Sequence, residues 1–273
     1  MRDSRDRDPD RDAVAGAEAS DPTSGAGAAR PAVPVPQTVT AALEDRPVDG
    51  ATCLEAGAGV GNATAGLLAA GAASVYAVTN DAAHARTVRE RVAPRAADRD
   101  RTAVLRADLR AVPLASDSVE VITAHGLFNV LPPGSLDAVA SELTRVAAPG
   151  CHLVLDDYEP PPDGAAVREL FAVENAATEL ARGRPALTFY PAAALRRLFD
   201  GYGWTFDRRR TLLAPVPWTA SHVAAHAGAA RAAAASLPED LRSALTAEAD
   251  RLQAAIGEES VGEMYSVAMR LPG

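Results

Sequence analysis

The residues of this chain that are best suited to chemistry lie in one short segment. It begins with an acid, Glu55, and continues with glycines at every second position, Gly57, Gly59 and Gly61. Glycine has no Cβ atom, so the backbone can turn sharply here and approach a ligand closely. An apolar run precedes the segment and an Ala/Leu-rich stretch follows it, which predicts a strand, a ligand-binding loop and a helix in that order.

The spacing of these glycines distinguishes between two classes of ligand. A dinucleotide-binding loop, G-x-G-x-x-G, would place its third glycine at position 62. Asn62 stands there instead, and the glycine comes one residue early. Because the chain is rich in alanine and glycine, such a pattern also arises by chance, and the elements around it must support it.

Beyond the loop, apolar segments alternate with helix-favouring ones. We expect strands at 51–55, 74–79, 102–107, 118–124 and 151–156, separated by helices near 61–71, 82–92 and 134–147. This alternation predicts an α/β fold with a doubly wound parallel sheet and right-handed crossovers. The remaining expected elements are a short helix at 37–45, helices at 165–182 and 192–202, a strand at 204–213, a helical stretch at 217–258 and a closing strand at 263–271.

Polar residues stand where the expected strands end. In an open α/β sheet, ligands bind beyond the carboxyl ends of the strands. The second strand ends in Thr79-Asn80-Asp81, the third in Asp108-Leu109, and the fourth runs into His125. All of these positions would lie near the glycine loop.

Taken together, these motifs resemble class I S-adenosylmethionine-dependent methyltransferases of the type 11-like kind. The loop matches the first motif of that family, Glu-x-Gly-x-Gly-x-Gly, and Pro149-Gly150 resembles the turn before its fifth strand. The resemblance covers roughly residues 50–157. It implies a seven-stranded Rossmann-like sheet whose last strand is antiparallel and inserted between strands five and six, and it implies S-adenosyl-L-methionine as cofactor.

The resemblance also implies which residues hold the cofactor. They are Glu55, Gly57, Ala58, Gly59, Gly61, Thr79, Asn80, Asp81, Asp108, Leu109 and His125. The family pattern has an acid for the ribose where Thr79 stands, so Asn80 and Asp81 are the alternatives, and Asp81 is also a suitable helix N-cap. Asp108 is expected to accept a hydrogen bond from the adenine amino group, or else to be an ordinary turn residue.

Methyl transfer is an in-line displacement that needs accurate positioning and, for an acceptor of high pKa, a base. His125 is the candidate catalytic residue, with a role of its backbone alone as the alternative. For the acceptor we expect contacts from Asp157, Tyr158, Tyr190 and Trp218, and Asp156 and Glu159 are further alternatives at the end of the fifth strand. The segments near 158–190 and 215–260 are expected to form helical caps, and packing between cap and sheet is the alternative role of these side chains.

Several other functions are disfavoured by the composition. Cys53 and Cys151 lie in apolar segments and read as buried thiols, and the i, i+4 pair His222 and His226 has no third ligand, so we expect no metal. The one basic run, Arg208–Arg210, reads as the solvated start of a strand, so no nucleic-acid partner is expected. No apolar run approaches the roughly 20 residues that span a bilayer.

The remaining expectations concern organisation and location. Residues 1–34 lack aromatics and are expected to be a disordered tail, with one methyltransferase domain from 35 to 273. The first twelve residues alternate Arg and Asp, which favours a cytoplasmic protein. All 27 basic residues are arginine and the net charge is −9, which favours a GC-rich genome and a halophilic host.

The sequence therefore predicts an S-adenosylmethionine-dependent methyltransferase that acts on a small molecule through an O, N or C nucleophile. Two alternatives stay open. One is a catalytically idle protein that binds the cofactor for regulation or interaction, and the other is an aminopropyl transferase-like enzyme. An NAD-dependent oxidoreductase is disfavoured by Asn62.

Overall fold

The computed structural model describes residues 35–92 and 96–273, which form two compact units. The predicted disorder of residues 1–34 falls outside the described residues. One unit is built on the sheet and comprises residues 35–162, 187–216 and 261–273. The other consists of residues 163–186 and 217–260 and is helical.

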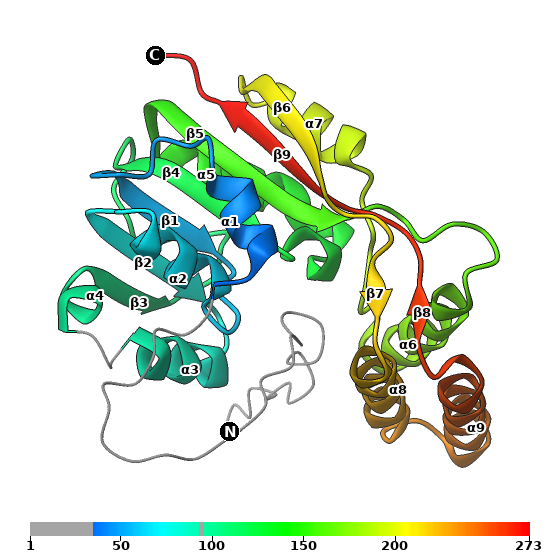
Figure 1. The fold of residues 1–273 in the computed structure, drawn as a ribbon. Coiled ribbons are helices and arrows are strands. Elements are labelled where there is room, and N and C mark those ends of the chain that lie inside the picture. The colour runs from blue at the N-terminus through cyan, green and yellow to red at the C-terminus, as the bar shows by residue number, and fades with distance from the viewer. Residues whose placement is uncertain (1–34, 93–95) are drawn as a thin grey trace, which may run out of the picture. The chain divides into compact units, whose positions relative to one another are not determined.

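The sheet unit holds seven strands in the order β3-β2-β1-β4-β5-β9-β6 (Figure 1). Their bounds are β1 (Thr52–Ala56), β2 (Ser74–Thr79), β3 (Thr102–Arg106), β4 (Val119–His125), β5 (Ala147–Tyr158), β6 (Thr205–Leu213) and β9 (Met264–Arg270). The first five strands are parallel, and β9 lies antiparallel between β5 and β6. The predicted fold is confirmed, including the inserted last strand.

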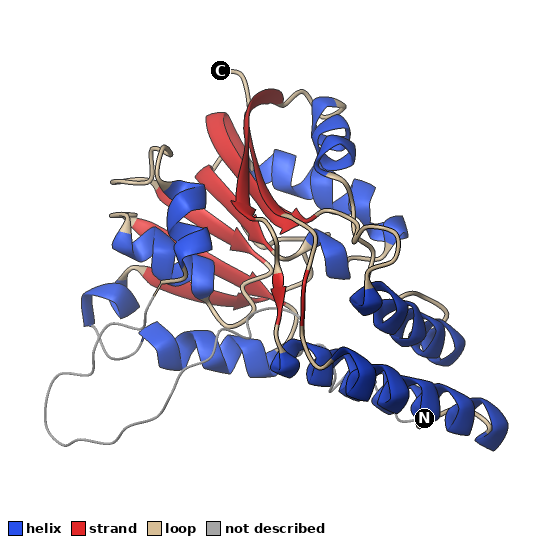
Figure 2. Cartoon of the chain, turned by 45° about the vertical axis from the view of Figure 1, so that its right-hand side comes forward, coloured by secondary structure: helices blue, strands red, loops and turns tan. Residues whose placement is uncertain are grey.

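Helices cover both faces of this sheet, as the two views of the chain show (Figures 1 and 2). One face carries α1 (Gln37–Leu43), α2 (Asn62–Ala69) and α3 (Ala82–Val92), and the other carries α5 (Leu136–Val146) and α7 (Ala192–Asp200). A short helix that the sequence did not predict, α4 (Ala96–Asp100), precedes β3. Because both faces are covered, the central strands are apolar on both sides: in β4 only Glu120 is exposed.

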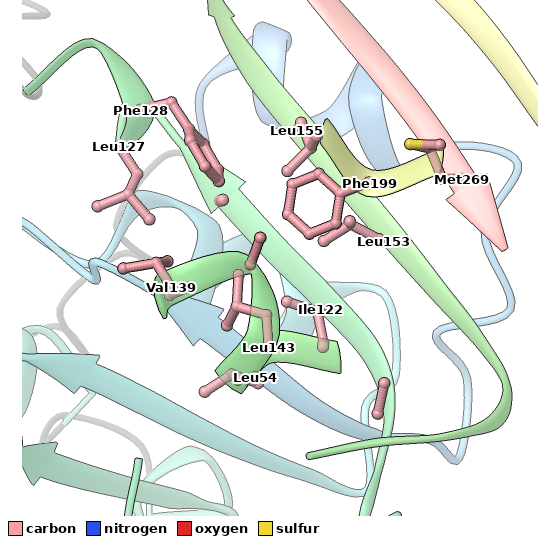
Figure 3. Packing of buried hydrophobic residues seen from close by; sticks show 14 of the residues in the cluster. Leu54, Ile122, Leu127, Phe128, Val139, Leu143, Leu153, Leu155, Phe199 and Met269 are labelled. Atoms are coloured by element: carbon pink, nitrogen blue, oxygen red, sulfur yellow. The ribbon is translucent and has the colours of Figure 1, made fainter. Parts of the chain in front are cut away.

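The main core lies between the sheet and the layer of α5 and α7 (Figure 3). Phe128 and Phe199 meet edge to face with ring centroids 5.9 Å apart. Leu143 of α5 is fully buried in the same cluster, with Ile122 and Leu153 from the sheet. This core fixes β4 and β5, whose carboxyl ends carry several of the expected site residues.

Two expectations about the sheet were wrong in detail. The strand expected at 151–156 begins at Ala147, so Pro149 and Gly150 lie inside β5, where the pairing of β4 with β5 shifts register. Such an irregularity is where a strand tolerates proline. Arg208 and Arg210 are not solvated at a strand start. They lie within β6 and donate to the carbonyls of Ala42 and Ala41 at the end of α1, each at 2.6 Å.

The helical unit consists of α6 (Ala166–Arg182), α8 (Ala220–Ala234), α9 (Glu239–Ile256) and the two-stranded pair of β7 (Pro217–Trp218) and β8 (Glu259–Ser260). Its core contains a hydrogen-bonded pair, with Nδ1 of His226 2.7 Å from the Glu174 carboxylate. Trp218 and Phe171 pack against each other with centroids 5.1 Å apart, and both rings also contact His226. His222 instead completes the N-terminal capping box of α8.

Two features are absent from the described part of the chain, a membrane-spanning helix and a metal-ligand cluster. Within 35–92 and 96–273, no helix is long and apolar enough to cross a membrane. In the same residues, no cluster of three or more His, Cys, Asp or Glu side chains could hold a metal ion. His222 and His226 both have structural partners in the helical unit: His222 caps α8, and His226 contacts the Glu174 carboxylate.

We predict that Leu143→Ala lowers the free energy of unfolding by about 2–5 kcal/mol, because it leaves a cavity in the core between α5 and the sheet. Urea unfolding followed by circular dichroism measures the change. Leu241→Ala is the matched control, since Leu241 is 43% exposed and its truncation should change stability by no more than about 0.5 kcal/mol. Equal losses in the two variants would contradict the assignment of this core.

Candidate functional site

The site begins with Glu55, the penultimate residue of β1, whose carboxylate is buried at the start of α2. It accepts hydrogen bonds from the backbone N–H groups of Ala63 (3.2 Å) and Thr64 (2.8 Å) and from the Thr64 hydroxyl. The first N–H groups of a helix have no partner within the helix, and their dipoles favour a negative charge. Glu55 thus ties the end of β1 to α2 across the glycine loop.

The loop between them adopts a backbone that only glycine adopts without strain. Gly57, Gly59 and Gly61 have φ of +74°, +46° and +81°. A Cβ at Gly57 would also lie 2.6 Å from Cδ1 of Leu127, so the Leu127 side chain would have to move. The N–H groups of Gly57 and Ala58 both donate to the carbonyl of Val78 in β2, at 3.0 and 2.8 Å. The glycine pattern is therefore a structural requirement of this turn.

At the end of β2, the consecutive residues Thr79, Asn80 and Asp81 differ in burial and in hydrogen bonding. Thr79 is buried, and its hydroxyl accepts from the N–H of Asp81 at 3.2 Å. Asp81 caps α3, because Oδ1 accepts from the N–H groups of Ala83 (2.6 Å) and His84 (2.9 Å). Burial alone would raise the pKa of Asp81, but these hydrogen bonds lower it below its usual value. Asn80 is exposed and has neither role.

At the end of β3, Asp108 forms a tight turn and an ion pair with Arg110. Its Oδ1 accepts from the Arg110 N–H at 2.9 Å, and Oδ2 lies 2.6 Å from the guanidinium. Both side chains are about half exposed. Leu109, by contrast, is buried beside the core.

The ends of β4 and β5 bring a histidine and two aspartates together. His125 and Asp156 are register partners in the parallel ladder, and Nδ1 of His125 lies 3.1 Å from Oδ2 of Asp156. Asp157 is buried and accepts from the N–H groups of Asn129 (3.0 Å) and Tyr158 (2.8 Å), so it holds the 3-10 turn Phe128–Val130 in place.

Burial changes the proton affinity of this cluster. It raises the pKa of Glu55 and of Asp157 to about 7 each, although the hydrogen bonds they accept act in the opposite direction. Burial alone would lower the pKa of His125, but the hydrogen bond to Asp156 and the charges of Asp156, Glu55 and Asp157 together raise it. Because the charge of each carboxylate also acts on His125, the three groups titrate as a coupled set.

The structure gathers the residues expected to hold the cofactor at one edge of the sheet, the carboxyl ends of β1 to β4. Of the residues expected to contact the acceptor, Tyr158 and Tyr190 lie in the sheet unit, where the Tyr190 hydroxyl is 3.4 Å from the carbonyl of Leu131. Trp218 lies in the helical unit and packs on Phe171 there. Asp156 was expected from the sequence only as an alternative acceptor-binding group, and its pairing with His125 was not predicted, since that pairing depends on strand register.

Comparisons with known proteins agree with this geometry. Residues 53–150 match the methyltransferase domain family. Among solved structures, the chain is similar to geranyl diphosphate C-methyltransferase from Streptomyces coelicolor A3(2), at 14% identity and a TM-score of 0.55, over 85% of this chain and 78% of that one. A comparison with curated protein sequences found no match.

Two other solved structures share the fold. The YcgJ protein from Bacillus subtilis is 11% identical with a TM-score of 0.58, over 86% of this chain and 98% of that one. The [4+2]-cyclase SpnF is 15% identical with the same TM-score, over 86% and 79%. At such identities these structures show a shared fold and do not indicate an acceptor.

The chain thus has an α/β fold whose glycine loop and polar residues lie at the carboxyl ends of its parallel strands. More narrowly, residues 53–150 match a methyltransferase domain, a kind of domain that uses S-adenosylmethionine, and solved methyltransferase structures share the fold of the chain. The site fits the cofactor: glycines of positive φ leave backbone free of side chains beside a helix N-terminus, and polar side chains follow at the ends of β2 and β3.

We predict that the protein loses stability as pH rises from about 4.5 to about 7. Glu55 and Asp157 have folded pKa values of about 7, above their ordinary values of 4.5 and 3.8, so between these limits the folded state holds protons that the unfolded state releases. The contribution of these two groups to the free energy of unfolding is complete below their ordinary pKa values. It is lost as pH rises through their folded pKa of about 7, a loss on the order of a few kcal/mol. Melting temperatures across this range measure it.

Glu55→Gln should flatten this dependence, since the amide does not titrate. Glu142→Gln is the matched control: the hydrogen bond from Arg145 lowers the pKa of Glu142, so its contribution is lost only in acid. A slope that is the same in wild type and Glu55→Gln would contradict the raised pKa of Glu55.

Proposed function

We propose that this methyltransferase acts on a small molecule and binds S-adenosylmethionine through the residues at the carboxyl ends of β1 to β4. The observation that carries the proposal is the buried Glu55 at the N-terminus of α2, behind a loop of positive-φ glycines. The proposed donor-binding set is Glu55, Gly57, Ala58, Gly59, Gly61, Asn80, Asp108, Leu109 and His125. A cytoplasmic location and a high-salt host stay proposals, the second supported by the net charge of −9.

For the ribose we favour Asn80 over its two neighbours. The carboxylate of Asp81 already caps α3. Thr79 is buried, and its hydroxyl already accepts a hydrogen bond from the Asp81 N–H. Asn80 is exposed directly after β2 and offers both a donor and an acceptor. For the adenine we keep Asp108, because it comes just after the strand next to β2 and its carboxylate, which accepts from Arg110, is about half exposed.

For the acceptor, we propose His125 as the catalytic residue and contacts from Tyr158 and Tyr190. Asp157 also stays a candidate, but its full burial and its bonds to backbone N–H groups support a role in positioning the segment after β4. Trp218 also stays a proposed acceptor contact.

Two alternatives differ from this proposal in chemistry. The [4+2]-cyclase SpnF shares the fold, so the fold by itself is compatible with another reaction or with an idle cofactor-binding protein. An idle protein would bind S-adenosylhomocysteine but transfer no labelled methyl group to any acceptor. An aminopropyl transferase-like enzyme would prefer the decarboxylated donor.

We predict that Gly59→Val abolishes binding of S-adenosylhomocysteine, as measured by calorimetry. A β-branched side chain at a φ of +46° is strained, and it would displace the backbone that approaches the ligand. Gly164→Val is the matched control, since Gly164 has a φ of +84° with nothing within 4 Å of the added Cβ and lies in the helical unit. It should keep full affinity. Binding of NAD in preference to S-adenosylhomocysteine would refute the proposal.

We predict that Asn80→Ala weakens binding of S-adenosylhomocysteine about tenfold, through the loss of hydrogen bonds to the ribose, and leaves the melting temperature unchanged. Asp81→Ala should do the reverse, lowering stability by about 0.5–2 kcal/mol because α3 loses its cap. Calorimetry and thermal melts on both variants separate the two roles. A large loss of affinity in Asp81→Ala alone would assign the ribose to Asp81.

A further inference from the structure

The pair formed by His125 and Asp156 is not explained by donor binding. The two residues lie opposite each other in neighbouring parallel strands, and the N–H of Gly126 donates to the Asp156 carbonyl at 2.8 Å. The backbone ladder therefore fixes both Cα positions, and the side chains meet at 3.1 Å. Such a contact, held by two strands of the sheet, is rigid.

The geometry sets which ring nitrogen of His125 carries the proton. A carboxylate only accepts hydrogen bonds, so Nδ1 of His125 donates to Asp156. In the neutral ring, Nε2 then has a free lone pair and can accept a proton. The His125 side chain is 18% exposed while that of Asp156 is 4% exposed, so the histidine is the accessible member of the pair.

The second oxygen of Asp156 gives independent support for a functional role. Oδ1 is buried and has no hydrogen-bond partner among the described residues. An unsatisfied buried polar atom costs about 1–3 kcal/mol, and in native proteins such atoms call for a functional explanation. If Asp156 served packing alone, a buried carboxylate oxygen without a partner would only cost stability, so packing does not explain this residue.

We propose that Asp156 is a positioning residue that holds His125 with Nε2 free to take a proton from the methyl acceptor. The acceptor is then an alcohol, phenol or amine that still bears its proton at neutral pH, because a thiolate or a carboxylate needs no base. This inference rests on the proposed methyl transfer to a small molecule and names the class of acceptor.

The step balances as follows. A lone pair on the acceptor oxygen or nitrogen forms the bond to the methyl carbon, and the bond from carbon to sulfur breaks with its electron pair remaining on sulfur, so the sulfonium becomes a neutral thioether. The proton of the acceptor passes to Nε2 of His125, and the resulting imidazolium is stabilised by Asp156. The proton is afterwards released to water.

The charged groups that act on His125 come from two strands. They are Asp156 and Asp157 from β5 and Glu55 from β1, and all are carboxylates. Each stabilises the imidazolium, but only Asp156 is hydrogen-bonded to the ring. Replacing Asp156 by asparagine removes one of these charges while keeping a side chain of the same shape.

The test is an NMR titration of the five histidines in 15N-labelled full-length protein, with His125 assigned through His125→Gln. In the wild type we expect the neutral His125 ring to carry its proton on Nδ1. In Asp156→Asn we expect its titration midpoint to move to lower pH. A neutral ring protonated on Nε2, or a midpoint that does not move in Asp156→Asn, would overturn the proposal.

The helical unit offers a matched control. His226 lies against Glu174 there, at 2.7 Å, and Glu174→Gln should leave the titration of His125 unchanged. Displacement of the His125 midpoint by this variant as much as by Asp156→Asn would show a general effect on folding and would also overturn the proposal.

A second measurement tests the class of acceptor with S-adenosylmethionine that carries a labelled methyl group. The wild type is incubated with a panel of phenols, alcohols, amines, thiols and carboxylic acids. Methyl ethers or methylated amines are expected, while products from thiols or carboxylates only, or no product from any hydroxyl or amine, count against the proposal. Failure of the protein to bind S-adenosylhomocysteine would instead refute the proposed function, whatever the titration shows.

Discussion

The structure of the site depends on one buried carboxylate, that of Glu55. It lies at the junction of β1, the glycine loop and α2, and it satisfies two N–H groups at the start of that helix. Without a negative group there, the helix would begin with unsatisfied donors in a water-free region. The loop can pass so close to Leu127 and the end of β2 because this anchor holds both of its ends and its glycines carry no side chains.

The same anchor carries an electrostatic consequence. Glu55, Asp156 and Asp157 all lie within the field of His125, and burial prevents water from screening them. A carboxylate cluster of this kind would repel an anionic acceptor and would stabilise a positive charge that develops on the histidine. The donor itself carries a positive sulfonium, which the cluster also favours.

Much of this could be predicted from the sequence, because the signals were local. The glycine spacing, the alternation of elements and the polar strand ends each lie within a few residues, and they located Glu55 and His125 correctly at strand ends. What the sequence could not give was pairing across strands. Asp156 and Asp157 are neighbours in sequence, yet they point to opposite faces of β5, and only the register shows that Asp156 meets His125.

Other residues were ambiguous for the same reason. Asp81 suits a helix cap and a ribose contact equally well in sequence, and the geometry of α3 shows the cap. The ion pair of Asp108 and Arg110 depends on the geometry of the turn after β3, which the sequence does not define. The start of β5 at Ala147 could be found only from its pairing with β4. In the sequence, proline before glycine ordinarily indicates a break between elements.

The arginines of β6 have a consequence for how the chain reaches this fold. Arg208 and Arg210 bind the carbonyl end of α1 across 166 and 169 residues of sequence. Within the described part of the chain, β6 joins the sheet through β9, which follows it in the sequence. During synthesis, α1 therefore has no completed sheet edge to dock on until β9 has left the ribosome. Because these hydrogen bonds join residues far apart in the sequence, we expect the sheet to be completed late in folding. Until β9 has paired with β5, the edge of β5 is open to other strands.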